Sequence, residues 1–247
     1  PCKFYVPRKE MFPGTGHRTP TSQTLTLAAT KDGQLQGMRH ISHVLTSPVA
    51  EWAESCGARS TAKVYASPAI DINETVYPVN VSSPTFMRAP GECPGMFALE
   101  CAMDELAIAL KIDPVALRLT NYAANEPMKD VPYSAKHLEE AYQVAAEKFG
   151  WSKRNPQPGA MKDGDLLVGW GMATATYPAH NMEAAAQAPL RADGRAVVQC
   201  ATHGLGPCAD APSTHITADH IARPRPTLHS PLGRPHPPSL PLPPRSH

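Results

Sequence analysis

The stretch Thr85-Phe-Met-Arg-Ala-Pro-Gly-Glu-Cys-Pro-Gly-Met-Phe-Ala-Leu-Glu-Cys-Ala-Met-Asp-Glu-Leu106 sets the fold around it. Its two Pro-Gly pairs, Pro90-Gly91 and Pro94-Gly95, predict a sharp turn of the backbone after Arg88. From Met96 onward, alanines and apolar residues spaced between acids favour a helix over a strand. A guanidinium held on a tight turn beside a helix N-terminus is suited to binding an anion. The alternative, from these residues alone, is a surface arginine on a loop.

Strands and helices are expected on both sides of this turn. Alternating residues predict a hairpin of Thr24–Thr30 with Leu35–Leu45. The other expected elements are a strand at Val76–Val81, a helix from Pro114 through Tyr122, a helix capped by Ser134 and ended by Gly150, a strand at Leu166–Tyr177, a hairpin about Asp193-Gly194 and a helix from Ser213 to Ile221. Because strands, then helices, then strands follow one another, the predicted fold class is α+β.

The charged and apolar composition indicates which kinds of binding partner to expect. The 23 Lys and Arg nearly balance the 22 Asp and Glu, which points to neither nucleic acid nor a membrane surface. No apolar run is long enough to span a bilayer. No secretion signal is visible at Pro1, and the compartment, cytoplasmic or periplasmic, stays open.

The cysteines and histidines give no pattern of a metal site. The cysteines form no CxxC pair, so iron–sulfur and structural zinc sites are not expected within this chain. His40 and His43 lie at odd spacing on a predicted strand, so their side chains should point to opposite faces of the sheet. No metal ligand is therefore assigned.

Several blocks of sequence, in order, resemble one known family. Met87–Ala107 resembles the signature of the molybdenum-binding (large) subunit of the xanthine dehydrogenase/aldehyde oxidoreductase family, and is most similar to bacterial aldehyde oxidoreductases. The resemblance extends from about Met11 to about Ile221 and covers a middle section of the family's longer subunit. The further blocks that carry it are Ile112–Tyr122, Pro132–Lys136, Ala146–Trp151 and Leu166–Ala179. It implies a partial molybdopterin-binding domain with mixed sheets and packed helices.

The resemblance assigns a role to the arginine turn. It implies that Arg88 lies near the molybdenum centre, where a fixed guanidinium would orient the substrate oxygen and stabilise developing charge. It also implies that the turn residues Ala89, Pro90 and Gly91 let the backbone approach the cofactor closely. Arg18 could add positive charge nearby.

A second family motif, a Gly-rich loop after a strand, falls on Ala201–Ala211. In the family this loop cradles pterin or pyrophosphate oxygens with backbone N–H groups, which implies cofactor binding here by Thr202, Gly204 and Gly206. The sequence departs from the pattern at Cys208 and at Asp210, whose carboxylate would repel phosphate.

The resemblance also implies a reaction, a cofactor and partners. Members of the family oxidise aldehydes or N-heterocycles, with oxygen derived from water. The cofactor is molybdopterin with molybdenum, in bacterial relatives usually as the cytosine dinucleotide. Electrons leave through [2Fe-2S] clusters to FAD, which would lie on separate iron–sulfur and FAD subunits.

Changes in composition suggest a division into domains. Residues 1–153 would form the first part of the molybdopterin-binding region, 154–164 a Pro/Gly/charged linker, and 165–222 the start of a second lobe. Residues 223–247 are rich in Pro, Arg and His, with little apolar surface to bury, so a disordered tail from outside the family is expected.

Two alternatives to an active enzyme are open. The family's general base is a glutamate near the subunit's C-terminus, beyond the section that this chain matches, so a truncated and catalytically inactive product is one alternative. The other is an interaction module that presents the Pro-rich tail 223–247 to an SH3-type domain.

Overall fold

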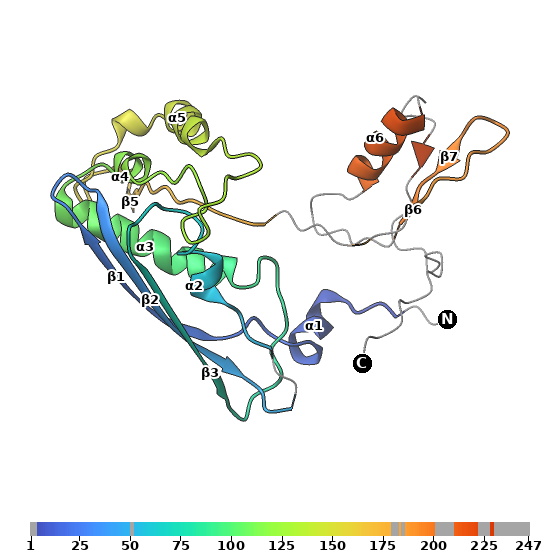
Figure 1. The fold of residues 1–247 in the computed structure, drawn as a ribbon, viewed down its shortest axis with the longest axis horizontal. Coiled ribbons are helices and arrows are strands. Elements are labelled where there is room, and N and C mark those ends of the chain that lie inside the picture. Colours follow the sequence, from blue (N-terminus) through green and yellow to red (C-terminus); the bar gives the residue numbers. More distant parts are fainter. Residues whose placement is uncertain are drawn as a thin grey trace. The chain divides into compact units, whose positions relative to one another are not determined.

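The computed structural model of the protein describes residues 4–49, 52–178, 183, 186–200, 210–221 and 228–229. The chain divides into two compact units, Val6–Pro178 and the remaining residues (Figure 1). The elements of the first unit are α1 (Arg8–Gly14), β1 (Thr21–Ala29), β2 (Leu35–Thr46), α2 (Cys56–Arg59), β3 (Ile70–Pro78), α3 (Glu92–Leu110), α4 (Pro114–Thr120), α5 (Leu138–Phe149), η1 (Trp151–Lys153), β4 (Lys162–Asp163) and β5 (Leu166–Leu167). The second contains β6 (Ala186–Gln187), β7 (Ala196–Val197), β8 (Gln199–Cys200), α6 (Asp210–Ile221) and β9 (Leu228–His229).

A three-stranded sheet of order β1-β2-β3 forms the centre of the first unit. β1 and β2 pair in antiparallel fashion, which confirms the predicted hairpin, and Gly33 in its turn has a positive φ of 89°. β3 runs parallel to β2 because the chain crosses over through α2, and it spans Ile70–Pro78 rather than Val76–Val81. On β2 the side chain of His40 is buried and that of His43 is exposed, which confirms their opposite directions.

Helix α3 packs along one face of this sheet, with contacts to β1 and α2 (Figure 1). Its buried residues Met96, Leu99, Met103 and Ala107 recur every three or four positions, so one stripe of the helix faces the strands. They form a core cluster with Leu35, Met38, Val64, Tyr65 and Leu117. The helix begins at Glu92, directly after the turn. The predicted α+β class is confirmed.

Local signals define the ends of the next two helices. Asp113 caps α4: its Oδ1 accepts hydrogen bonds from the backbone N–H groups of Val115 (2.8 Å) and Ala116 (3.1 Å). Gly150, with φ of 80°, ends α5 as predicted. The prediction that Ser134 caps α5 is wrong, because the helix begins only after His137, which makes no side-chain cap.

The predicted strand Leu166–Tyr177 is also largely wrong, since only Leu166–Leu167 pairs, with Lys162–Asp163. Beyond β5 the backbone bonds to side chains instead of a neighbouring strand. The carbonyl of Trp170 accepts from Arg154 Nε at 3.0 Å, and the N–H of Thr174 donates to Glu100 Oε2 at 2.8 Å. These bonds hold the segment, and the predicted linker 154–164 before it, within the first unit.

The second unit contains the hairpin predicted about Asp193-Gly194, for which strands at Ala188–Arg191 and Ala196–Ala201 are expected. Leu190 bridges Ala196, and β6 pairs with β8. Helix α6 begins at Asp210 rather than Ser213. Thr202, Gly204, Gly206 and all of the tail 223–247 except Leu228–His229 lie outside the described residues. Across the described part of the chain, none of the helices has the length and apolar character needed to cross a membrane.

Candidate functional site

The arginine turn lies directly before α3 and has a strained backbone. Ala89 has a φ of 57° and Gly91 a φ of 89°, both in the left-handed region. The carbonyl of Ala89 accepts from the N–H of Cys93 (3.0 Å), and that of Gly91 accepts from Gly95 (2.9 Å), so the turn continues into the first turn of the helix. Residues that carry a Cβ atom rarely adopt these backbone dihedral angles, so contacts with neighbouring residues must hold the turn in place.

Those contacts come from the ion pair of Glu54 with Arg18. The Glu54 side chain is fully buried, and its Oε2 accepts from Arg18 Nη1 at 3.2 Å and from the backbone N–H of Gly91 at 3.0 Å. Arg18 in turn donates to the carbonyl oxygen of Arg88 (2.5 Å) and to that of Ala89 (3.3 Å). Two side chains thus bind the main chain at three of the four residues of the turn.

A second ion pair joins α2 to the start of α3. Arg59 Nη1 contacts Glu92 Oε1 at 3.0 Å, and the Glu92 side chain is only 3% exposed. The Cδ of Arg59 and the carbonyl of Ser55 leave no space beside Gly91, since a Cβ there would lie 2.6 Å and 2.8 Å from them. Both the dihedral and the packing therefore require glycine at this position.

Arg88 is the uncompensated charge of the turn. Arg18 is neutralised by Glu54 and Arg59 by Glu92, whereas the exposed guanidinium of Arg88 has no ion-pair or hydrogen-bond partner among the described residues. The 19-residue helix α3 adds the partial positive charge of its N-terminus beside it. A surface groove of about 660 Å³ between β1 and α3 is lined at this end by Arg18, Cys93 and Pro94.

These features fit an anionic or oxyanionic group at the turn. The backbone is rigidly curved, a donor-rich cation points outward, and the excess charge is positive. Within the described ranges, no cluster of three or more His, Cys, Asp or Glu could hold a metal ion.

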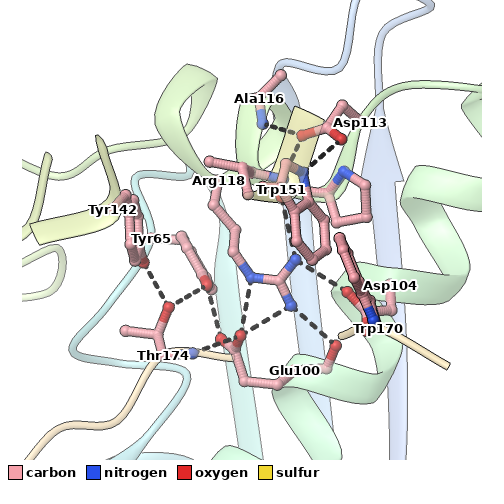
Figure 2. A network of polar contacts seen from close by, with 12 residues as sticks. Tyr65, Glu100, Asp104, Asp113, Ala116, Arg118, Tyr142, Trp151, Trp170 and Thr174 are labelled. Carbon is pink, nitrogen blue, oxygen red and sulfur yellow. Dashed lines mark hydrogen bonds and ion pairs between the residues drawn. The ribbon is translucent and has the colours of Figure 1, made fainter. Parts of the chain in front are cut away.

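A second polar cluster, around Arg118, is structural (Figure 2). The fully buried Arg118 contacts Glu100 Oε2 (2.8 Å) and Asp104 Oδ1 (2.9 Å), so Asp104 is paired rather than a freely solvated helix charge. The Tyr65 hydroxyl donates to Glu100 Oε1 at 2.6 Å, and the burial of Tyr65, with the nearby charge of Glu100, raises the pKa of its phenol. Thr174 completes the cluster, which joins α3, α4 and α5 to the segment after β5.

The predicted site residues Arg88, Ala89, Pro90 and Gly91 lie together on the turn, while Thr202, Gly204 and Gly206 fall outside the described residues. Sequence reasoning missed Glu54, Arg59 and Glu92, which shape the turn. Glu54 is separated in the sequence from Arg18 by 36 positions and from Gly91 by 37, so no local spacing of residues indicates its role. The one available signal is an acid within the otherwise uncharged segment Trp52–Gly57.

Comparison with known proteins gives a consistent result. Residues 1–122 match a family model described as the molybdopterin cofactor-binding domain. The aldehyde oxidoreductase molybdenum-binding subunit PaoC of Escherichia coli (strain K12) is 34% identical over 174 residues, which cover 70% of this chain and 24% of PaoC. The putative xanthine dehydrogenase molybdenum-binding subunit XdhA of the same strain is 26% identical over 236 residues, 91% of this chain and 31% of XdhA. The chain thus spans about a quarter to a third of the length of these relatives.

A solved structure shares the fold. The aldehyde oxidoreductase from Desulfovibrio gigas superposes with a TM-score of 0.64, at 22% identity, over 88% of this chain and 25% of its own. At this level of identity the likeness concerns the fold alone.

Proposed function

Because the chain belongs to the molybdenum-binding (large) subunits of the xanthine dehydrogenase/aldehyde oxidoreductase family, we propose that it forms part of a molybdenum hydroxylase in which Arg88 acts on the substrate. The observation that carries this proposal is the exposed guanidinium of Arg88, which has no partner among the described residues and stands on a turn whose backbone is bound by Arg18 and Glu54. When bound, the molybdopterin cofactor supplies the oxidation of an aldehyde or N-heterocycle, with oxygen derived from water.

The role of Arg88 follows from the charge that develops on the substrate. When the carbonyl carbon of an aldehyde is attacked, negative charge grows on its oxygen. A guanidinium presents several N–H donors in a planar fork and is always charged, so Arg88 would orient that oxygen and stabilise the charge. Lysine would keep the charge but lose the fork.

The cofactor contacts are proposed from both motifs. The turn Ala89–Gly91 would allow close approach of the backbone, and Thr202, Gly204 and Gly206 would donate backbone N–H groups to pterin or pyrophosphate oxygens. We extend the proposal to the cytosine dinucleotide form of molybdopterin, and to iron–sulfur and FAD subunits as separate partners that receive the electrons.

The test uses the full chain, produced in a host that makes molybdopterin. We expect bound molybdenum by elemental analysis and aldehyde-dependent reduction of a dye by the purified protein. Arg88→Ala and Arg88→Lys should retain the metal but lose turnover by about 100-fold or more, as expected for a donor to a developing oxyanion.

Arg39→Ala is the matched control, since Arg39 is an exposed arginine on β2 that pairs with Asp71 on β3 and with no residue of the turn. It should leave both metal content and turnover unchanged. Full turnover of Arg88→Ala would contradict the role of Arg88. A chain with neither molybdenum nor turnover would contradict the proposal and favour the truncated, inactive product.

A further inference from the structure

Glu54 and Arg18 are the two side chains that hold the main chain of the arginine turn. We infer that they are positioning residues, which fix the direction in which Arg88 leaves the backbone. The inference rests on the proposed function of Arg88, but the contacts that carry it belong to this chain alone.

The contacts fix the turn on both sides of Ala89. Before it, Arg18 donates to the carbonyl oxygen of Arg88 at 2.5 Å; after it, the N–H of Gly91 donates to Glu54 at 3.0 Å. Arg18 also donates to the carbonyl oxygen of Ala89 itself at 3.3 Å. The orientation of the two peptide groups next to Ala89 is therefore set by two side chains that lie far away in sequence.

The turn needs this support because of its backbone geometry. Ala89 has a φ of 57°, which an alanine adopts only when its surroundings impose it. Released from Arg18 and Glu54, Ala89 would return to a negative φ. Arg88 would then move with its peptide, since no described residue holds its guanidinium.

Charge and burial make the pair interdependent. The Glu54 side chain is fully buried, so its charge requires the Arg18 guanidinium, which is 29% exposed. Glu54→Gln would remove the charge that holds Arg18 and the charged acceptor for Gly91. Arg18→Lys would keep a cation for Glu54, but a single ammonium cannot reproduce the fork that serves Glu54 and two carbonyl oxygens.

The first experiment needs no cofactor. The full chain is digested briefly with trypsin, and cleavage at the Arg88–Ala89 bond is followed by mass spectrometry, with hydrogen exchange of the Gly91 amide measured in parallel. Glu54→Gln and Arg18→Lys should each raise the cleavage rate and the exchange rate by about tenfold or more. Each variant weakens hydrogen bonds to a charged group, and a factor of about ten corresponds to the free energy that such bonds contribute.

Controls separate local loosening from general instability. Asp71→Asn and Arg39→Lys break or weaken an ion pair that is 3.0 Å long but exposed, and they should change neither rate. Amides of β2 report the stability of the whole unit. If Glu54→Gln raises exchange in β2 as much as at Gly91, or raises neither rate, the positioning role is overturned.

The second experiment tests whether the pair acts through Arg88. In molybdenum-loaded protein, Glu54→Gln should lower kcat by about tenfold with little change in KM for the aldehyde, and should have no further effect when Arg88 is already alanine. Equal losses in both backgrounds would overturn the inference. If the wild-type chain has neither molybdenum nor turnover, the proposed function fails, while digestion and exchange still decide whether the pair positions the turn.

Discussion

At the scale of single residues, Gly91 combines two requirements, one on its backbone dihedral angle and one on the space beside its Cα atom. Its φ of 89° excludes most side chains, and the space where a Cβ would stand is filled by Arg59 and Ser55. Gly159 has a similar φ of 73° but has open space around it. Comparing the two positions separates the cost of the dihedral from the cost of crowding.

We therefore predict that Gly91→Ala lowers the free energy of unfolding by roughly 2–4 kcal/mol, from the dihedral and the overpacking together. Gly159→Ala should cost only about 1 kcal/mol, from the dihedral alone. Urea unfolding of both variants measures the difference. Equal losses would show that the contacts around Gly91 relax without cost.

His40 is a second residue whose surroundings lead to a prediction, here on how folding stability depends on pH. Its ring is fully buried, with Nε2 2.9 Å from Gln23 Oε1 and Nδ1 2.7 Å from Thr61 Oγ1. The Gln23 amide nitrogen donates to Thr21 Oγ1 and the Pro94 carbonyl, so its oxygen faces the ring and accepts from Nε2. Both ring nitrogens are thus satisfied in the neutral form, and burial lowers the pKa of His40 from 6.5 to about 4.

The sign of the pH dependence follows from this shift. Between pH 6.5 and pH 4 the unfolded chain binds a proton at His40 that the folded chain does not, so folding stability should fall by roughly 3 kcal/mol as the pH is lowered through this window. In His40→Gln that part of the loss should disappear, whereas His43→Gln, at an exposed position, should keep it. Urea unfolding at several pH values tests this, and identical pH profiles for the two variants would contradict it.

At the scale of elements, Arg118 joins α3 to α4. Its fully buried guanidinium contacts Glu100 and Asp104 on α3 and the carbonyl of Pro114 at 3.0 Å (Figure 2). Glu100 in turn receives the N–H of Thr174, so the same carboxylate holds the segment after β5. Removing the arginine would leave a buried carboxylate without its cation.

Arg118→Met should therefore cost roughly 3–5 kcal/mol of folding stability. Arg39→Met breaks the exposed pair with Asp71, with side chains 59% and 64% exposed, and should cost at most about 1 kcal/mol. Thermal and urea unfolding of both variants compare the two losses. A loss for Arg118→Met as small as that for Arg39→Met would show that Glu100 finds another partner.

At the scale of the whole molecule, the core cluster is built entirely from residues of the unit Val6–Pro178. That unit also includes the late segment around Thr174, which is bonded to Glu100. The cooperative core should therefore depend on the chain as far as Pro178, beyond the predicted linker 154–164.

This leads to a prediction with two shortened chains. A chain that ends at Pro178 should unfold cooperatively with the midpoint that the full-length chain shows for this unit. A chain that ends at Gly164 loses the Thr174 N–H bond to Glu100 and the packing of Trp170 against Phe149, and should lose roughly 2 kcal/mol or more. Far-UV circular dichroism during urea unfolding tests both, and equal midpoints for the two chains would contradict it.

The sequence by itself determined the elements that depend on a few consecutive residues. The turn after Arg88, the hairpin of β1 and β2, the helix start at Pro114 and the Gly150 helix end were all predicted, because each arises from local dihedral preferences and nearby hydrogen bonds. The position of Arg88 on the candidate site was predicted in the same way, with family resemblance supplying its role.

Only the tertiary structure decided what holds that turn and which segments surround it. Arg18 and Glu54 reach Arg88 and Gly91 across 70 and 37 residues, β3 pairs parallel to β2, and Thr174 bonds to Glu100 in place of a strand neighbour. Such partners are chosen by the requirement that buried charges and backbone groups be satisfied once the chain is folded. That requirement acts between atoms that meet only in the folded molecule, so no local pattern in the sequence records it.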